Sequence, residues 1–385
     1  MLLNRILNFF TSLRLTVVCL CVALLLVFIG TLAQVDEGLY NAQNRYFRSL
    51  LICWTPKGAD WRIPVFPGGY LIGGVLLINL LAAHAKRFQF TKKKIGIFII
   101  HAGIVLLLLG QFATDLLSTE SAMRLAEGES KNYSESGRES ELVFIDVSDP
   151  KFDQVIAIPQ GLLKGGVELR PDKLPFAVRV REFFPNSHLA EAETGVQTAG
   201  NHGAGANLVA HLLPRVTDMD LRDMPSAIVE LISSSGSLGT WLVSTHLENP
   251  QTISVGEKSY KMAQRFTRYY KPFSLELLKF SHDLYKGTDT PKNFSSRVHI
   301  NNPNTGENRE VLIYMNNPLR VSGETYYQAG FAPDNDKRVN KVTILQVVRN
   351  PGWLTPYFSC VLVALGLIVQ FMSHLIGFAR KRRTA

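Results

Sequence analysis

The stretch that most constrains this chain is an apolar run that begins at Ile95, directly after three consecutive lysines, and ends at Leu117. A run of about 20 apolar residues suits a helix that crosses the hydrocarbon core of a bilayer. One histidine, His101, lies inside the run, about 10 Å from Lys94 at the helical rise per residue. Because an ionisable residue at that depth is costly to place in lipid, His101 is a candidate functional residue.

Three further apolar runs predict membrane-spanning helices over residues 15–33, 68–85 and 354–377, so that the run 95–117 is the third of four. The first run is longer than the core of a signal peptide, and we expect it to be retained. The expected fold is an α-helical membrane protein with four transmembrane helices. Residues 1–117 hold the first three, and residues 353–385 hold the fourth with a basic tail.

The basic balance of the chain comes from its membrane-flanking segments. The formal net charge is +9, from 41 basic and 32 acidic residues. Eleven of the cations lie beside apolar runs, in residues 1–14, 86–94 and 380–383, where there is no acidic residue. Removing these eleven leaves 30 basic residues against 32 acidic ones, a net charge of −2. We therefore exclude nucleic acid as a partner, and the positive-inside rule places both termini and residues 86–94 in the cytoplasm.

Residues 118–352 then form a large extracytoplasmic domain between the third and fourth helices. Short apolar or alternating segments separated by turn residues predict a β-rich fold of sheets or a sandwich. The expected strands lie at residues 141–147, 155–158, 176–180, 227–232, 241–244, 275–280, 311–314, 325–328 and 341–348. Residues 186–222 interrupt this pattern around a glycine-rich centre, which we expect to be a mobile insertion.

Glycine spacing predicts which helix faces pack. Gly96, Gly103 and Gly110 recur every seven residues and so line one face of the third span, with His101 roughly 160° away from them. In the second span, a GxxxG pair that begins at Gly69 permits close helix contact. We therefore expect the third span to turn its glycines toward one neighbour and its histidine toward another.

The cysteines exclude two classes of redox protein. Cys19, Cys21, Cys53 and Cys360 form no CxxC and no CxxCH motif, so the chain is neither a thioredoxin-like reductant nor a c-type cytochrome. The β-rich domain contains no cysteine and folds on its core alone.

Three histidines from different spans lie in the cytoplasmic third of the predicted bundle: His84, His101 and His374. A buried imidazole there serves as an axial ligand of haem iron, as a ligand of another metal, or in a proton relay, for which Asp115 is the single candidate acid. Structural roles compete with these. His84 and His374 lie near helix ends, where they can reach headgroup water, and His101 can bond a neighbouring carbonyl. Gln370 shares a helix face with His374.

Taken together, these segments resemble the ResB proteins of System II cytochrome c biogenesis over essentially the whole chain. The order of three spans, a large β-rich domain and one last span is uncommon and is part of the resemblance. The residues that carry it are Ser12-Leu13-Arg14-Leu15-Thr16, Gly30-Thr31-Leu32-Ala33-Gln34, His101-Ala102-Gly103, Thr288 to Val298 (TDTPKNFSSRV), Asn316-Asn317-Pro318-Leu319 and Tyr326-Tyr327-Gln328. The family usually has a proline where Ala33 stands here.

The resemblance implies a subunit of a cytochrome c synthase complex in the cytoplasmic (inner) membrane. Such proteins work with a CcsA-type partner that carries a tryptophan-rich loop, and together they export haem and attach it to apocytochrome c. This chain has four tryptophans, none adjacent, so the resemblance implies the half-site subunit of a haem lyase. Haem b would be the transported substrate and His101 its axial ligand, with His374 and, more weakly, His84 as further candidates.

Two other classes of protein fit the same features. One is a membrane-anchored assembly factor or apocytochrome chaperone without a haem site of its own. The other is a permease-like component of an export system, although such proteins commonly place the large domain after the first span.

A topology reporter tests the arrangement. Fused after residue 200, an enzyme that is active only outside the cytoplasm should be active, because eleven flanking cations hold both termini and residues 86–94 inside. The same reporter fused after residue 385 should be inactive. Reporter activity at the C-terminus and none at residue 200 would show that the topology is the reverse of the predicted one.

Overall fold

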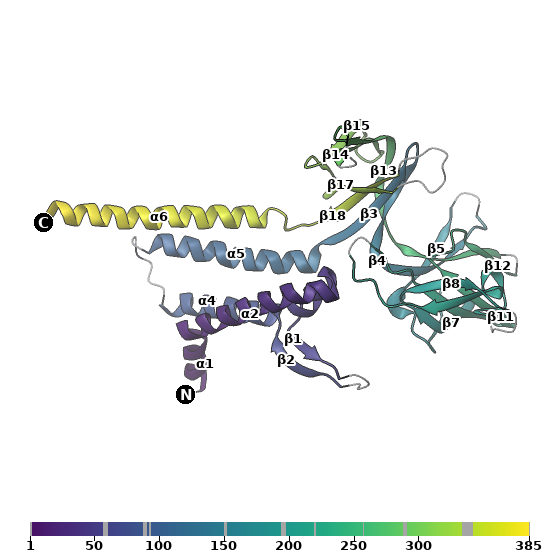
Figure 1. The fold of residues 1–385 in the computed structure, drawn as a ribbon, viewed down its shortest axis with the longest axis horizontal. Coiled ribbons are helices and arrows are strands. Elements are labelled where there is room, and N and C mark those ends of the chain that lie inside the picture. Colours follow the sequence, from purple (N-terminus) through teal and green to yellow (C-terminus); the bar gives the residue numbers. More distant parts are fainter. Residues whose placement is uncertain are drawn as a thin grey trace. The chain divides into compact units, whose positions relative to one another are not determined.

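The computed structural model of the chain describes residues 2–56, 61–87, 91, 94–149, 152–193, 198–218, 221–256, 258–287, 291–332 and 342–384. Lys92, Lys93, residues 288–290 and Lys341, which entered the sequence predictions, lie outside these ranges. The chain forms two compact units, which we describe separately (Figure 1). The membrane unit comprises Met1–Ser118, Thr217–Met219 and Asn350–Ala385, and the β unit comprises Thr119–Val216 and Asp220–Arg349.

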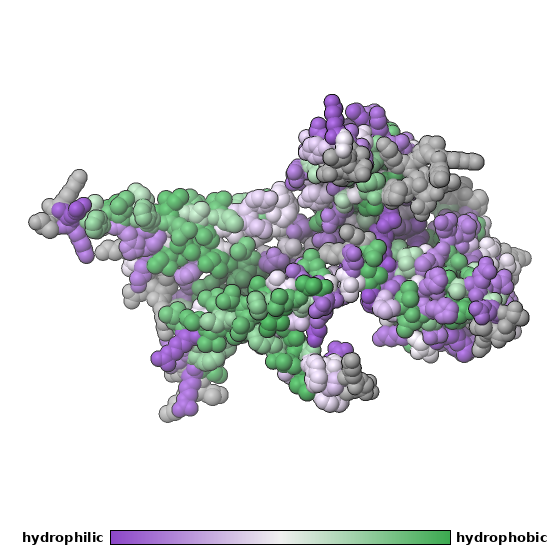
Figure 2. Space-filling model, viewed as in Figure 1, coloured by the Kyte–Doolittle hydropathy of each residue, from purple (hydrophilic) through white to green (hydrophobic). Residues whose placement is uncertain are grey.

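The membrane unit is helical, with one β-hairpin. Its elements are α1 (Leu2–Phe10), α2 (Leu13–Glu37), α3 (Leu39–Ala42), the π-helical turn η1 (Gln43–Phe47), β1 (Leu51–Trp54), β2 (Ile63–Pro67), α4 (Gly69–Arg87), α5 (Ile95–Leu117) and α6 (Thr355–Thr384). Within the described residues, α2, α4, α5 and α6 are long and apolar enough to cross a membrane. Apolar residues cover most of the visible surface of these helices (Figure 2). Helix α5 has the predicted bounds, and the other three lie over the predicted runs.

Helices α5 and α6 pack through the heptad glycines, as the sequence predicts. A Cβ atom added to Gly96 would lie 2.7 Å from the backbone nitrogen of Gln370, and one added to Gly103 would lie 2.8 Å from Val363 Cγ2. The third glycine, Gly110, meets Thr355. All three glycines are buried. The backbones of the two helices thus approach more closely than any side chain would allow.

The predicted helix contact at the GxxxG pair of α4 is wrong. Gly69 packs against the backbone of Phe47 in the π-helical turn, whereas a Cβ atom added to Gly73 would meet nothing within 4 Å. Gly69 therefore allows the π-helical turn to pack closely on the start of α4, and Gly73 lies on an open face of the helix.

A buried asparagine joins α4 to the N-terminal helices. Asn79, which is 4% exposed, accepts a hydrogen bond from the hydroxyl of Thr16 at 2.6 Å. Its amide nitrogen donates to the carbonyls of Phe10 at 2.6 Å and Ser12 at 3.2 Å. These carbonyls lie where α1 ends and α2 begins, so Asn79 ties α4 to the junction of the two N-terminal helices.

The β unit contains three sheets. Its strands are β3 (Thr119–Ala126), β4 (Ser130–Asp146), β5 (Gln154–Pro159), β6 (Glu168–Leu169), β7 (Phe176–Phe184), β8 (Ser187–Glu191), β9 (Leu208–Leu212), β10 (Ser226–Ser233), β11 (Gly236–Ser244), β12 (Gln251–Val255), β13 (Lys258–Leu284), β14 (Pro291–Asn302), β15 (Glu307–Tyr314), β16 (Leu319–Val321), β17 (Glu324–Ala332) and β18 (Val342–Arg349). The largest sheet has the order β15-β14-β13-β4-β3-β18-β17-β16, with β12 on β13 and β5 on β4. A second sheet has the order β11-β10-β7-β6, and β8 pairs with β9.

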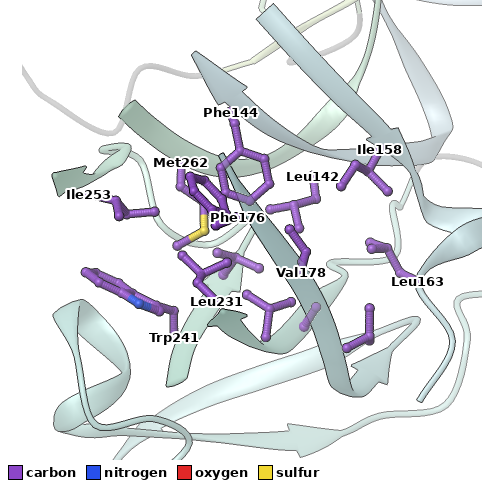
Figure 3. Close-up of a cluster of buried hydrophobic side chains, with 14 of the residues drawn as sticks. Leu142, Phe144, Ile158, Leu163, Phe176, Val178, Leu231, Trp241, Ile253 and Met262 are labelled. Carbon is purple, nitrogen blue, oxygen red and sulfur yellow. The ribbon is translucent and has the colours of Figure 1, made fainter. Parts of the chain in front are cut away.

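Two hydrophobic cores share the long strand β13. In the first core, the sheet β11-β10-β7-β6 packs on β4, β5, β12 and the beginning of β13, with Phe144, Phe176 and Met262 among the buried side chains (Figure 3). In the second core, all the buried side chains come from the largest sheet, among them Leu275 of β13 and Tyr326 of β17. Because one sheet supplies that whole core, it must curl around it, and β15 contacts β17.

Residues 186–222, expected to be a mobile insertion, are ordered where the structure describes them. They contain β8, β9 and the 3₁₀ turn η3 (Gly203–Ala206). The backbone of Asn201 bonds the carbonyl of Thr240 in β11, and the ring of His202 lies 5.4 Å from that of Trp241. The glycines allow this backbone to lie against a strand edge: a Cβ atom on Gly205 would lie 2.8 Å from Leu242. The segment thus covers the edge of β11.

Two alanine substitutions test the glycine contact. Gly96→Ala should destabilise the membrane unit by about 1–3 kcal/mol, because its methyl group overlaps the backbone of α6. Gly73→Ala, on the open face of α4, is the matched control and should be neutral or slightly stabilising. The measurement is the midpoint of unfolding when mild-detergent micelles are titrated with a denaturing detergent. Equal midpoints for the two variants would mean that α5 and α6 do not depend on this contact.

Candidate functional site

The structure brings two of the three candidate histidines together. His84 lies near the C-terminal end of α4, and His101 lies in the second turn of α5. His101 Nδ1 is 3.1 Å from His84 Nε2, and the two rings are 4.6 Å apart and nearly perpendicular. From the sequence, His84 lies near a helix end, where it can reach headgroup water. In the structure its ring packs on that of His101. Both side chains are half-buried.

The hydrogen bonds fix which nitrogen carries each proton in the neutral pair. His84 Nδ1 lies 3.1 Å from the carbonyl oxygen of Leu80. A carbonyl only accepts, so His84 Nδ1 carries the proton and His84 Nε2 is a bare acceptor. The Nδ1–H of His101 then donates to His84, which leaves the lone pair on His101 Nε2. Within the described residues, no hydrogen bond reaches that nitrogen.

This arrangement is the one that protein metal sites use to orient a ligating imidazole. A ligand histidine usually donates its other ring N–H to an acceptor, which fixes the ring and raises the basicity of the ligating nitrogen. Here His84 is the acceptor, and it is itself held by the backbone of α4. The lone pair of His101 Nε2 is therefore available to coordinate a metal ion. The hydrogen bond to His84 holds the His101 ring in that orientation.

The helix packing explains why these two rings meet. The connection between α4 and α5 is short, so the two helices are antiparallel neighbours. The glycines of α5 face α6, and His101, on the opposite side of the same helix, faces α4. The predicted division of α5 into a glycine face and a histidine face is therefore what the structure has.

The third candidate, His374, does not join the pair. Its Nε2 lies 2.8 Å from the amide nitrogen of Gln370, one turn earlier on α6, as their shared face predicts. The amide oxygen of Gln370 is buried and, among the described residues, has no hydrogen-bond partner. His374 bonds Gln370, whereas His84 and His101 bond each other.

Asp115 is not placed for a proton relay with His101. It lies fourteen residues further along α5, about 21 Å away along the helix axis. Its carboxylate is 3.3 Å from the guanidinium of Arg48 and 3.4 Å from the hydroxyl of Tyr70. These contacts join the start of α4 and the π-helical turn to the end of α5, so the role of Asp115 is structural.

The pair offers one nitrogen, His101 Nε2, to a metal ion. Within the described residues, no group of three His, Cys, Asp or Glu side chains could hold a metal ion, and the cysteines there are free. A metal bound to His101 would need its remaining ligands from a cofactor or another molecule. A porphyrin supplies four nitrogens to its iron and leaves only the axial positions to the protein.

Nitrogen NMR tests the proton assignment. In the full chain labelled with 15N-histidine and held in lipid nanodiscs, His101 should show a protonated Nδ1 and an unprotonated Nε2. His84→Ala should abolish that preference, because the acceptor is removed. His374→Ala, which alters a histidine on another helix, should leave the His101 signals unchanged. A protonated Nε2 on His101 in the unaltered chain would contradict the assignment.

Comparison with known proteins identifies relatives. A model of the ResB-like family matches residues 231–343, which lie entirely in the β unit. The chain is also 25% identical over 314 residues, 79% of its length, to Protein NrfI of Wolinella succinogenes. The alignment covers 30% of that relative, so the chain spans about a third of its length. These findings confirm the predicted resemblance of the chain to the ResB-like family.

Proposed function

We propose that this chain is a component of cytochrome c biogenesis that binds haem in its membrane unit and presents it for covalent attachment to apocytochrome c. The similarity to ResB-like proteins and to NrfI supports the process. In this role the chain is a multi-pass protein of the cytoplasmic (inner) membrane. Haem b is its transported substrate, and a CcsA-type protein is its partner.

The observation that carries the proposal is the free lone pair of His101 Nε2. Haem iron takes a neutral imidazole nitrogen as an axial ligand, and the protein around it tunes its chemistry. His84 keeps the His101 ring in one tautomer and one orientation. An apolar helix surface beside an oriented imidazole suits the binding of a flat, largely apolar macrocycle.

The second axial ligand would come from the partner. His84 Nε2 already accepts the hydrogen bond of His101, and the ring nitrogen of His374 is bonded to Gln370. We therefore assign His101 as the ligand, His84 as a positioning residue and His374 to a role outside the iron site. This division makes the chain the half-site subunit of a haem lyase rather than an enzyme on its own.

The place of the pair along the helices fits entry from the cytoplasm. His84 and His101 flank the α4–α5 connection, whose cations favour the cytoplasmic side. The β unit follows α5 and precedes α6, so in this topology it lies on the side where apocytochrome c receives haem. In this scheme the membrane unit holds the cargo, and the β unit meets the apocytochrome or the partner.

The substitution His101→Ala should abolish cytochrome c maturation while the protein remains inserted in the membrane and bound to its partner. Removal of the ring leaves the iron without an axial ligand and opens a cavity, so added imidazole should restore part of the activity. Holocytochrome is measured by haem staining, and haem bound to the purified complex by its Soret absorbance. His211→Ala, at an exposed position of β9 in the β unit, is the control.

The positioning residue should respond differently. His84→Ala should lower maturation without abolishing it, and His84→Gln should recover part of the loss because an amide oxygen can accept the same hydrogen bond. Normal maturation and normal Soret absorbance in His101→Ala would exclude this haem site. The chain would then be a membrane-anchored assembly factor.

A further inference from the structure

Three arginines, Arg124, Arg222 and Arg268, lie on one face of the β unit. In the sheet formed by β3, β4 and β13, Ala122 lies opposite Glu135, and Glu135 lies opposite Arg268. Two residues along β3 from Ala122, Arg124 projects from the same side of the sheet, since side chains alternate along a strand. Arg222 reaches this face from the segment between β9 and β10.

Aromatic rings hold two of these arginines in place. The guanidinium carbon of Arg268 lies 4.1 Å from the ring centroid of Tyr133, and that of Arg222 lies 4.9 Å from the ring centroid of Phe266. Cation–π contacts of this kind orient the guanidinium plane without using its N–H donors. Arg268 uses its Nε–H for Glu135, and its two terminal NH2 groups and the guanidinium of Arg222 are available to a ligand.

Among the described residues, the three arginines form one ion pair, so two of them are left without a paired carboxylate. Glu135 pairs with Arg268 at 3.2 Å, and its negative charge also acts on Arg222. Within the described residues, neither Arg124 nor Arg222 has an ion-pair partner of its own. Burial, and after it the charge of Arg124, lowers the pKa of Arg222. A half-buried guanidinium beside another cation is costly unless an anion compensates it.

We infer that Arg124, Arg222 and Arg268 form a binding site for an oxyanion ligand with a charge of about −2. Guanidinium groups bind phosphate and carboxylate oxygens in pairs, and three of them against one glutamate match a dianion. Two sources carry this chemistry. One is a free phosphate, and the other is the pair of carboxylates on a porphyrin such as haem, a source that rests on the proposed function.

Two substitutions with opposite effects test the site in the full chain in lipid nanodiscs. The first probe is inorganic phosphate, titrated by calorimetry at low salt. Arg222→Gln should weaken its binding about tenfold through the loss of a charge-assisted contact. Glu135→Gln should strengthen it, because the competing carboxylate is removed while the amide can still bond Arg268. Arg309→Gln, an exposed arginine of β15 paired with Glu307, is the control and should have no effect.

The second probe separates the two sources. Iron protoporphyrin and its dimethyl ester, which lacks the carboxylates, are titrated into the His101→Ala chain, so that iron ligation in the membrane unit does not contribute. If carboxylates occupy the site, Arg222→Gln weakens the binding of the porphyrin acid and leaves the binding of its ester unchanged. If free phosphate is the ligand, only the phosphate titration responds.

The inference fails if neither phosphate nor the acid porphyrin distinguishes Arg222→Gln from Arg309→Gln, or if Glu135→Gln does not tighten the binding. The second criterion holds even if Arg222→Gln impairs folding. If His101 does not bind haem, the phosphate titration still tests the arginine site. The haem proposal and the oxyanion site can therefore be tested separately.

Discussion

The close contact of α5 with α6 is the interaction on which the rest of the architecture depends. These helices come directly before and after the β unit in the sequence, and the first and last strands of that unit, β3 and β18, pair with each other from Thr119 and Arg349 onward. The two ends of a very long chain segment are therefore joined twice, once by helices and once by strands. Closing so long a loop costs conformational entropy, and the glycines that let the helix backbones touch help to offset it.

The same contact makes the histidine pair possible. A helix with glycine on one face and histidine on the other can satisfy both only between two neighbours. With the glycines against α6, the imidazole of His101 must face α4, where His84 accepts its hydrogen bond. The tautomer of a single ring thus follows from a seven-residue repeat of glycine along the same helix.

Much of this could be predicted from the sequence, because heptad spacing and hydrophobic length are local properties. The bounds of α5 and the opposite faces of its glycines and histidine belong to this group. The pairing of His84 could have been found as well. His84 and His101 lie at similar distances from the connection between two antiparallel helices, and such positions face each other. Asn79 carried a weaker signal, a lone amide in an apolar run.

Other features depend on contacts that no local pattern shows. The first half of β4 is too polar to predict as a strand, because its neighbours β3 and β13 decide its conformation rather than its own side chains. A glycine can let two helices pack closely, or it can let a backbone segment lie against a strand. Its spacing in the sequence does not show which. Gly73 resembles a helix-packing residue but has no neighbour, whereas the glycines near His202, which resemble a mobile loop, let the backbone lie on β11.

The length of β13 has a consequence for how the β unit opens. One continuous strand supplies side chains to both hydrophobic cores, so neither core can release it without exposing the other. A unit built this way behaves as a single cooperative block, in which slow hydrogen exchange should extend along β13 from one core into the next. A disturbance at one end of the block is then felt at the other as a change in stability, with no change of shape required.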